Sequence, residues 1–407
     1  MRTRIPRLVL VLCALAAPAA AQTDTARQDE ALGARAAKAE RPAPYVPGRV
    51  ERLLDTLDSS PTVKRMFAPH DGFGFRIGGI PGGSSIAVGP SWRRSTLAGG
   101  NLQLHASGAM SIAADTGLEA GLTVPHAGTR RLAFDASVTA THLANERFFG
   151  LGAETAKANE TAFGADYRHV AARGTLAPAA WLTVAGSAGT LTASAADTEG
   201  RRVPAISARF VAPQAPGLGS ETRFTTLSLA TTVDYRDVPM NPRGGGRYHV
   251  AVSRFADRSG TAHSFTRIDA EVEQHLSAWK RQRVLTLRAI ASSLVADRGN
   301  GVPFHMQPTL GGSRVLRGFV TDRFRDRNLL ALQAEYGWDV MPFLNAVVFY
   351  ETGTVAARWT DIDMNRFEKD YGIGFRFGSA RTVAFRTDVA LGSGEGTRFT
   401  VRMNHAF

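Results

Sequence analysis

Residues 223–236 read Arg-Phe-Thr-Thr-Leu-Ser-Leu-Ala-Thr-Thr-Val-Asp-Tyr-Arg, and their alternation decides the fold class. From Leu227 to Tyr235, large apolar side chains and Thr231 occupy every second position, and small, hydroxyl or acidic side chains stand between them. Successive side chains of a β-strand point to opposite faces, so this stretch predicts a strand with one apolar and one polar face.

The same period of two recurs from residue 72 to the end of the chain. In residues 264–276, four apolar side chains oppose the set Arg267, Asp269, Glu271, Glu273 and His275. In residues 381–391, four apolar side chains again oppose Arg386 and Asp388. A soluble sandwich would turn the apolar faces inward. Many such strands in a row favour instead an all-β, antiparallel transmembrane barrel, with apolar side chains toward lipid and polar ones toward a wet lumen.

The N-terminal segment has the marks of a secretory signal peptide at residues 1–21. Arg2, Arg4 and Arg7 precede a short apolar run, and Ala19-Ala20-Ala21 supplies the small residues that a signal peptidase needs. The run spans about 10 residues, whereas a membrane-crossing helix needs roughly 20. Cys13, the one cysteine, lies inside this segment, so the mature chain is expected to hold no disulfide and no thiol. The predicted location is a Gram-negative-type outer membrane.

The chain is basic, with a formal net charge of +12, of which the three signal arginines contribute +3. A basic chain can indicate a nucleic-acid partner when its cations cluster beside stacking aromatic residues. Here the arginines are scattered over alternate strand positions. They are therefore interpreted as lining the lumen or facing anionic lipid headgroups, and no nucleic-acid partner is expected.

Residues 22–71 form a region of different character, predicted to be a periplasmic linker. Residues 22–45 carry almost no large apolar side chain, which is typical of disorder. Residues 47–67 place Val50, Leu53, Leu54 and Leu57 at helical spacing, which fits either a short amphipathic helix or a linker turn. The barrel is predicted over residues 72–407.

Sixteen candidate strands can be counted, an even number as bacterial barrels require. They lie near 73–79, 84–93, 101–113, 117–124, 131–141, 161–172, 180–190, 223–236, 246–257, 263–276, 283–295, 328–338, 343–351, 369–378, 382–391 and 397–407. The longest connections are 142–160, 191–222, 296–327 and 352–368, and all fall on the predicted extracellular side. Fourteen strands, with two weak early hairpins omitted, is the alternative count.

The connection 296–327 contains Leu310-Gly311-Gly312-Ser313-Arg314-Val315-Leu316-Arg317-Gly318-Phe319. Residues 349–353 read Phe-Tyr-Glu-Thr-Gly, and the chain ends on Phe407. Together these features resemble the BamA/TamA family of outer-membrane barrels, also described as bacterial surface antigens. The resemblance extends to Asn145–Gly152 in the third surface loop and to the turn from Asp234 to Gly244. It spans about residues 72–407.

The resemblance implies that the sixth surface loop folds into the lumen and is latched there. In the family, the loop arginine meets acidic side chains on the inner wall, which places Arg317 near Glu335 and Glu351. A planar guanidinium binds carboxylates through two parallel hydrogen bonds, and Gly318 lets the loop approach the wall closely. Phe319 and Gly353 complete the predicted latch. The family usually has Asp at position 351. An ordinary surface arginine with two solvated glutamates is the alternative interpretation.

The two ends of the barrel are predicted to form a weak seam. Glycines at Gly74 and Gly78 weaken the first strand and its pairing. The last strand turns Phe399, Val401 and Phe407 outward, and a terminal Phe resembles the assembly signal of such barrels. The functional interpretation is a seam that opens sideways to admit client strands, and the alternative is a barrel seam with no such role.

Periplasmic POTRA domains, which bind client polypeptides in this family, need roughly 75 residues each, as small autonomous domains do. Residues 22–71 are too few, so a barrel without POTRA domains is predicted, with outer-membrane lipid, a periplasmic partner and client polypeptides as expected partners. Neither a serine-hydrolase elbow, nor a phosphate loop, nor an HExxH motif occurs.

No catalytic residues, metal ligands or cofactors are therefore assigned, and the chain is predicted not to be an enzyme. The family resemblance favours a role in outer-membrane biogenesis, by protein insertion or translocation or by lipid handling. A passive pore or surface-antigen barrel and a membrane-embedded hydrolase remain the alternatives. A disulfide across the seam distinguishes the first two, and turnover on a lipid or peptide substrate distinguishes the third.

Overall fold

The computed structural model describes residues 71–83, 86–198, 203–278, 282–341, 343–378, 383–392 and 394–403. The predicted signal peptide at 1–21, the linker as far as residue 70, its short helix and the terminal Phe407 lie outside these residues. Within the described part of the chain, no helix is long and apolar enough to cross a membrane.

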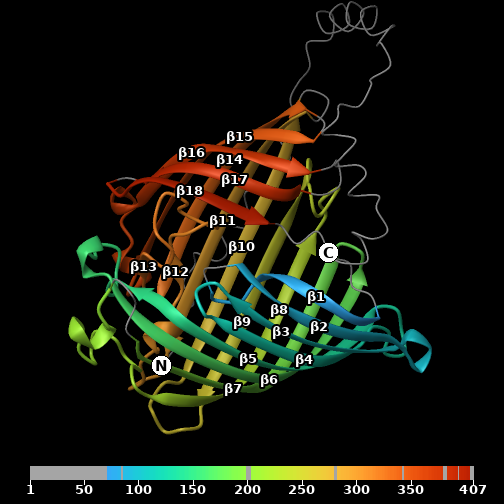
Figure 1. The fold of residues 1–407 in the computed structure, drawn as a ribbon, viewed down its shortest axis with the longest axis horizontal. Coiled ribbons are helices and arrows are strands. Elements are labelled where there is room, and N and C mark those ends of the chain that lie inside the picture. Colours follow the sequence, from blue (N-terminus) through green and yellow to red (C-terminus); the bar gives the residue numbers. More distant parts are fainter. Residues whose placement is uncertain are drawn as a thin grey trace, which may run out of the picture. The chain divides into compact units, whose positions relative to one another are not determined.

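A single sheet contains sixteen antiparallel strands, each paired with its neighbours in chain order (Figure 1). They are β1 (Gly72–Gly79), β2 (Ile86–Leu97), β3 (Leu102–Ser111), β4 (Thr116–Val124), β5 (Leu132–Phe148), β6 (Thr161–Ala179), β7 (Leu182–Asp197), β8 (Glu221–Asp234), β9 (Gly245–Asp257), β10 (Phe265–Ala278), β11 (Arg283–Ala296), β14 (Asn328–Met341), β15 (Leu344–Ala356), β16 (Glu368–Gly378), β17 (Val383–Gly392) and β18 (Gly396–Met403). Two short strands, β12 (Thr309–Leu310) and β13 (Phe324–Arg325), form a separate pair within the connection between β11 and β14.

All sixteen predicted strands are present, so the alternative count of fourteen is wrong. The predicted bounds are too short for β5 and β6, which run to 17 and 19 residues. Both strands contain a register shift, and their far ends carry polar and small residues that obscure the alternation. The pair β12–β13 was not predicted, because two residues are too few to show a period.

The apolar faces of the strands point outward, and the polar faces point into the lumen. Phe73 and Phe75 of β1 are 83% and 74% exposed, and Leu229 of β8 is 59% exposed. Conversely, Glu351 of β15 and Asp370 of β16 are fully buried on the inner side. This inversion of a soluble protein's pattern is the arrangement of a transmembrane β-barrel.

The apolar core of the described chain lies under the long connections rather than between the strands. Phe304, from the β11–β14 connection, packs edge-on against Phe148 and Phe163 with ring centroids 5.0 and 4.7 Å apart. Aromatic pairs of this geometry contribute beyond the area they bury. The long loops therefore form a packed layer at one end of the barrel, and this layer positions the site described next.

Candidate functional site

The connection between β11 and β14, residues 297–327, turns inward and lines the lumen. The β12–β13 pair forms its base, and Leu310, Leu316 and Phe319 pack with Leu329 and Val355 of the barrel wall. Gly311 and Gly312 have φ of +104° and +105°, a conformation that L side chains rarely adopt. A Cβ on Gly311 would lie 2.3 Å from the Val320 carbonyl oxygen, so the turn requires glycine there.

At the tip of this loop, Arg317 is held by Glu351 of β15. The Nε of Arg317 donates to Oε1 of Glu351 at 2.8 Å, and its Nη2 lies 2.7 Å from the same oxygen. The backbone N–H of Arg317 donates to Oε2 at 2.8 Å. The longer glutamate, at a position where the family usually has aspartate, thus binds both the side chain and the backbone of Arg317. The guanidinium also lies 3.5 Å from the centre of the Phe349 ring.

Two further carboxylates and a second arginine complete the cluster. Arg317 lies 3.3 Å from Glu335 of β14 and 3.2 Å from Asp388 of β17. Arg376 of β16 binds the same two carboxylates at 2.8 and 2.7 Å. We call Arg317, Glu335, Glu351, Arg376 and Asp388 the latch cluster. Because these charges are largely removed from water, loss of one partner leaves the others uncompensated, which is strongly destabilising.

The neighbouring Gly318 fixes the loop backbone against the wall. Its N–H donates to Asp370 Oδ2 at 2.5 Å. A Cβ on Gly318 would lie 2.4 Å from the backbone nitrogen of Gly392, at the end of β17. A side chain at this position would therefore require the loop or the end of β17 to move.

The electrostatics keep Arg317 charged. Burial by itself lowers the pKa of Arg317, but the carboxylates of Glu351, Glu335 and Asp388 outweigh it and raise that pKa above its ordinary value. The loop tip therefore carries a permanent positive charge, which the carboxylates on the inner wall of β14, β15 and β17 balance.

The structure brings together Arg317, Gly318, Glu335 and Glu351, so solvated glutamates do not describe this site. Phe319 is buried in the loop's apolar cluster, and Gly353 is buried on β15 opposite Ala331. Sequence reasoning missed Asp370 and Arg376 and did not assign Asp388 to the site. Asp388 was recognised as facing the polar side, but a period of two does not show which polar residues a distant loop will reach.

The rest of the loop is anchored on two sides. Arg323 donates to the Thr155 hydroxyl at 2.9 Å and pairs with Glu395 in the turn between β17 and β18. The Gly152 N–H donates to the Arg325 carbonyl at 2.9 Å. The segment Asn145–Gly152, part of the family resemblance, thus packs on the latched loop.

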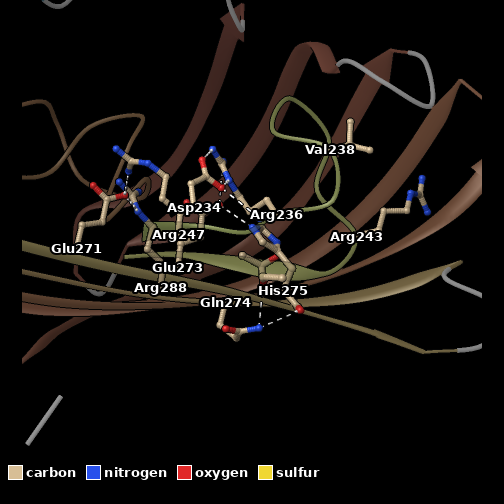
Figure 2. Close-up of polar contacts among 12 residues, drawn as sticks. Asp234, Arg236, Val238, Arg243, Arg247, Glu271, Glu273, Gln274, His275 and Arg288 are labelled. Atoms are coloured by element: carbon tan, nitrogen blue, oxygen red, sulfur yellow. Dashed lines mark hydrogen bonds and ion pairs between the residues drawn. The ribbon is translucent and has the colours of Figure 1, made fainter. Parts of the chain in front are cut away.

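The turn between β8 and β9, residues 235–244, reaches across to β14 and the start of β17. Figure 2 shows the polar network at its base, where Arg236 binds Asp234 at 2.9 and 2.6 Å. At its far end, Arg243 binds Asp339 of β14 at 2.6 and 2.8 Å. The Met240 carbonyl accepts from the Val383 N–H at 3.4 Å. A cavity of about 380 Å³ lies between this turn and the loop tip.

The two end strands, β1 and β18, stand at opposite ends of the strand order of the described sheet. Gly74 and Gly78 lie on the inner face of β1, as its alternating burial shows. Phe399 and Val401 of β18 are 67% and 50% exposed on the outer face. Among the described residues, no group of His, Cys, Asp and Glu has the arrangement of a metal site.

Comparison with known proteins gives a family and a fold. Residues 97–407 match the model of the Omp85 superfamily domain, which covers more than half of the chain. BamA from Haemophilus ducreyi lacking POTRA domains 1–3 is similar with a TM-score of 0.63 and 11% identity, over 82% of this chain and 70% of that one.

CdiB from Escherichia coli is similar with a TM-score of 0.51 and 12% identity, over 83% of this chain. The match spans 61% of the CdiB chain, which is less than two thirds of its length. At these identities both likenesses show the fold alone. No curated protein matches the sequence.

Proposed function

This chain belongs to the Omp85 superfamily, and on that premise we propose that it acts in outer-membrane biogenesis by moving polypeptide into or across the membrane. In this proposal the lumen is closed at rest by the latched loop. Client polypeptide engages the barrel at the seam between β1 and β18. A periplasmic partner delivers the client.

The observation that carries the proposal is the latch cluster. Arg317 and Glu351, with side chains 7% and 0% exposed, hold the loop backbone inside the lumen. A passive pore gains nothing from filling its own lumen with a buried ionic network. The same network is useful in a barrel that must stay closed at rest and open under control.

The connection between latch and seam supports a gated barrel. The loop tip contacts the end of β17 through Gly318 and Gly392. Arg402 of β18 donates to the Ser313 carbonyl in the loop at 2.7 Å. A movement of the closing strand is therefore transmitted to the loop, and release of the loop removes contacts from the closing strand.

The testing experiment locks the seam. Phe75→Cys of β1 is combined in turn with Thr397→Cys, Phe399→Cys and Val401→Cys of β18, all on the outer face of the sheet, so that one pair comes within disulfide distance. The control is Ala120→Cys with Val138→Cys, residues that face each other in the paired strands β4 and β5. Oxidised and reduced proteins are compared for assisted insertion of a client barrel into liposomes and for planar-bilayer conductance.

The proposal expects the seam disulfide to abolish client insertion and the control disulfide to leave it unchanged. It also expects a mostly closed barrel whose rare openings vanish on oxidation. Large, steady conductance that is unchanged by the seam disulfide, without client insertion, would contradict the proposal and favour a passive pore.

A further inference from the structure

Three arginines form a row across the last strands of the barrel. Arg376 of β16 stands directly opposite Arg386 of β17, and Arg386 stands directly opposite Arg402 of β18. Like charges at facing positions repel one another and destabilise a sheet. The row therefore requires compensation by negative charge.

Among the described residues, the carboxylates of the latch cluster form ion pairs with the first arginine of the row and not with the other two. Arg376 binds Asp388 and Glu335. Neither Arg386 nor Arg402 forms an ion pair with a carboxylate among the described residues, and Arg402 donates only to the Ser313 carbonyl. The Nε atoms of Arg376 and Arg386 are buried and have no hydrogen-bond partner within the described chain. Buried donors of this kind are costly unless a ligand accepts from them.

All three arginines line the cavity between the loop tip and the turn 235–244, and Arg314 of the loop joins them. The cavity wall contains more arginines than its own carboxylates can pair. Its arginines are Arg236, Arg243, Arg288, Arg314, Arg317, Arg376, Arg386 and Arg402, and its acidic residues are Glu271, Glu273, Glu335 and Asp339. Five of these arginines bind carboxylates, because Arg236 pairs with Asp234, Arg243 with Asp339, Arg288 with Glu271, and Arg317 and Arg376 with the latch cluster. Among the described residues, no ion pair involves the remaining three, Arg314, Arg386 and Arg402.

We propose that this cavity binds a phosphate-bearing anion, with Arg386, Arg402 and Arg314 as its ligands. A phosphoryl group offers three acceptor oxygens and up to two negative charges, so it can accept from several guanidinium groups at once. A single carboxylate offers two acceptor oxygens and one negative charge, which is less than the three guanidinium groups without an ion pair can bind. The cavity volume of about 380 Å³ lies in the range of small-molecule sites and accommodates a phosphate or a lipid headgroup.

A bound phosphate would join β17 and β18 to the latched loop through Arg386, Arg402 and Arg314. It would thereby strengthen the attachment of the closing strand next to the seam. The phosphate can come from a free anion or from a phospholipid headgroup that reaches the lumen, and both sources share the same recognition chemistry.

The test measures binding to the full chain refolded in a zwitterionic detergent without phosphate groups. Isothermal titration calorimetry with inorganic pyrophosphate, dihexanoyl phosphatidylglycerol and hexaglutamate compares the wild type with Arg386→Gln/Arg402→Gln. The control is Arg173→Gln, which removes one positive charge from β6, on the face of that strand that carries Tyr167 and outside the lining of this cavity. Heat-modified migration on gels verifies that each variant folds.

Binding of pyrophosphate or phosphatidylglycerol that weakens at least about tenfold in the double variant, but not in Arg173→Gln, is the expected result, since one hydrogen bond to a charged group contributes that much. Pyrophosphate binding alone identifies a free anion, and phosphatidylglycerol binding alone identifies a headgroup. Absence of both, equal loss in the control, or binding of hexaglutamate only would overturn the proposal.

A second readout separates ligand binding from a purely structural role. Without phosphate, the double variant is expected to unfold at the same temperature as the wild type or higher, because it relieves repulsion. With phosphate, only the wild type and Arg173→Gln are expected to gain thermal stability. The proposed site would be contradicted if the double variant unfolded at a lower temperature than the wild type without phosphate and gained as much thermal stability as the wild type when phosphate is added.

Discussion

The first strands of the barrel and the last ones face the same lumen, but their ion pairs are built differently. On β1, Arg76 lies 3.2 Å from Glu119 of β4, and the two side chains are 34% and 39% exposed. At the other end, Arg317 lies 2.7 Å from Glu351, and these side chains are 7% and 0% exposed. Similar distances thus belong to a solvated pair in one region and a buried pair in the other.

The distance between two charged groups therefore does not by itself determine how much their ion pair contributes to the free energy of unfolding. A solvated pair contributes roughly 0–1 kcal/mol because water and salt screen it. Breaking a buried pair costs about 3–5 kcal/mol because the remaining charge has no water to replace its partner. The last strands, β14 to β18, should therefore be rigid and sensitive to substitution, and the first strands, β1 to β4, should tolerate substitution.

The largest expected effect is that of Arg317→Ala. It leaves Glu351, Asp388 and Glu335 with one cation in place of two, so we expect a loss of about 3–5 kcal/mol in the free energy of unfolding. Urea unfolding followed by heat-modified gel migration measures it. Arg76→Ala is the matched control and should cost about 1 kcal/mol or less. Equal losses would remove the distinction between the two regions.

Gly318→Ala should have the next largest effect, about 3 kcal/mol, at the upper end of overpacking costs. Its Cβ would lie 2.4 Å from the backbone nitrogen of Gly392. Neither atom can rotate away, because the Cβ is fixed to the main chain of the loop and the nitrogen is part of β17. Gly79→Ala on β1, where nothing lies within 4 Å of the added Cβ, should be nearly neutral. The rate of hydrogen exchange over residues 313–323 should rise in Gly318→Ala and stay unchanged in Gly79→Ala. An unchanged rate in Gly318→Ala would show that the loop is not held through Gly318.

A pH effect is expected at the base of the loop. Burial, with the nearby Arg325 and His263, lowers the pKa of His305 to about 3. The unfolded chain, with a histidine pKa near 6.5, therefore binds one more proton than the folded chain between these values. The contribution of His305 to the free energy of unfolding is fully present above about pH 6.5 and decreases as the pH falls. At pH 5 the expected loss is about 2 kcal/mol.

His305→Gln should weaken this pH dependence. The measurement is hydrogen exchange of residues 300–325 at pH 7 and pH 5 in both proteins. An equal rise in exchange in both proteins on acidification would assign the effect to other groups.

The smallest expected effect is that of Asp339→Asn, which weakens the contact between β14 and the turn 235–244. The Arg243 and Asp339 side chains are 23% and 28% exposed, so we expect a loss of about 1 kcal/mol or less. Asp361→Asn, in the exposed pair with Arg358, is the control. A spin label at Val238 should become more mobile only in Asp339→Asn, and identical spectra would show that the salt bridge does not hold the turn.

The sequence predicted the strands and the heart of the latch for different reasons. A period of two is a local property, so Leu227 to Tyr235 could be assigned to faces without any tertiary information. Arg317, Glu335 and Glu351 were found through a motif. Asp370 and Arg376 were not found, and the turn 235–244 was noted as part of the family resemblance without its contacts, because these roles depend on which segments meet across the lumen. Facing residues such as Arg376, Arg386 and Arg402 depend on register, which alternation alone does not fix.

The central claim is that the buried latch cluster holds the lumen closed, and that the solvated ion pairs of the first strands do not. Single-channel conductance of the wild type, Arg317→Ala and Arg76→Ala in planar bilayers tests it most directly. We predict rare, brief openings for the wild type and Arg76→Ala, and large, sustained conductance for Arg317→Ala. Sustained conductance in all three, or closed channels in all three, would contradict the claim.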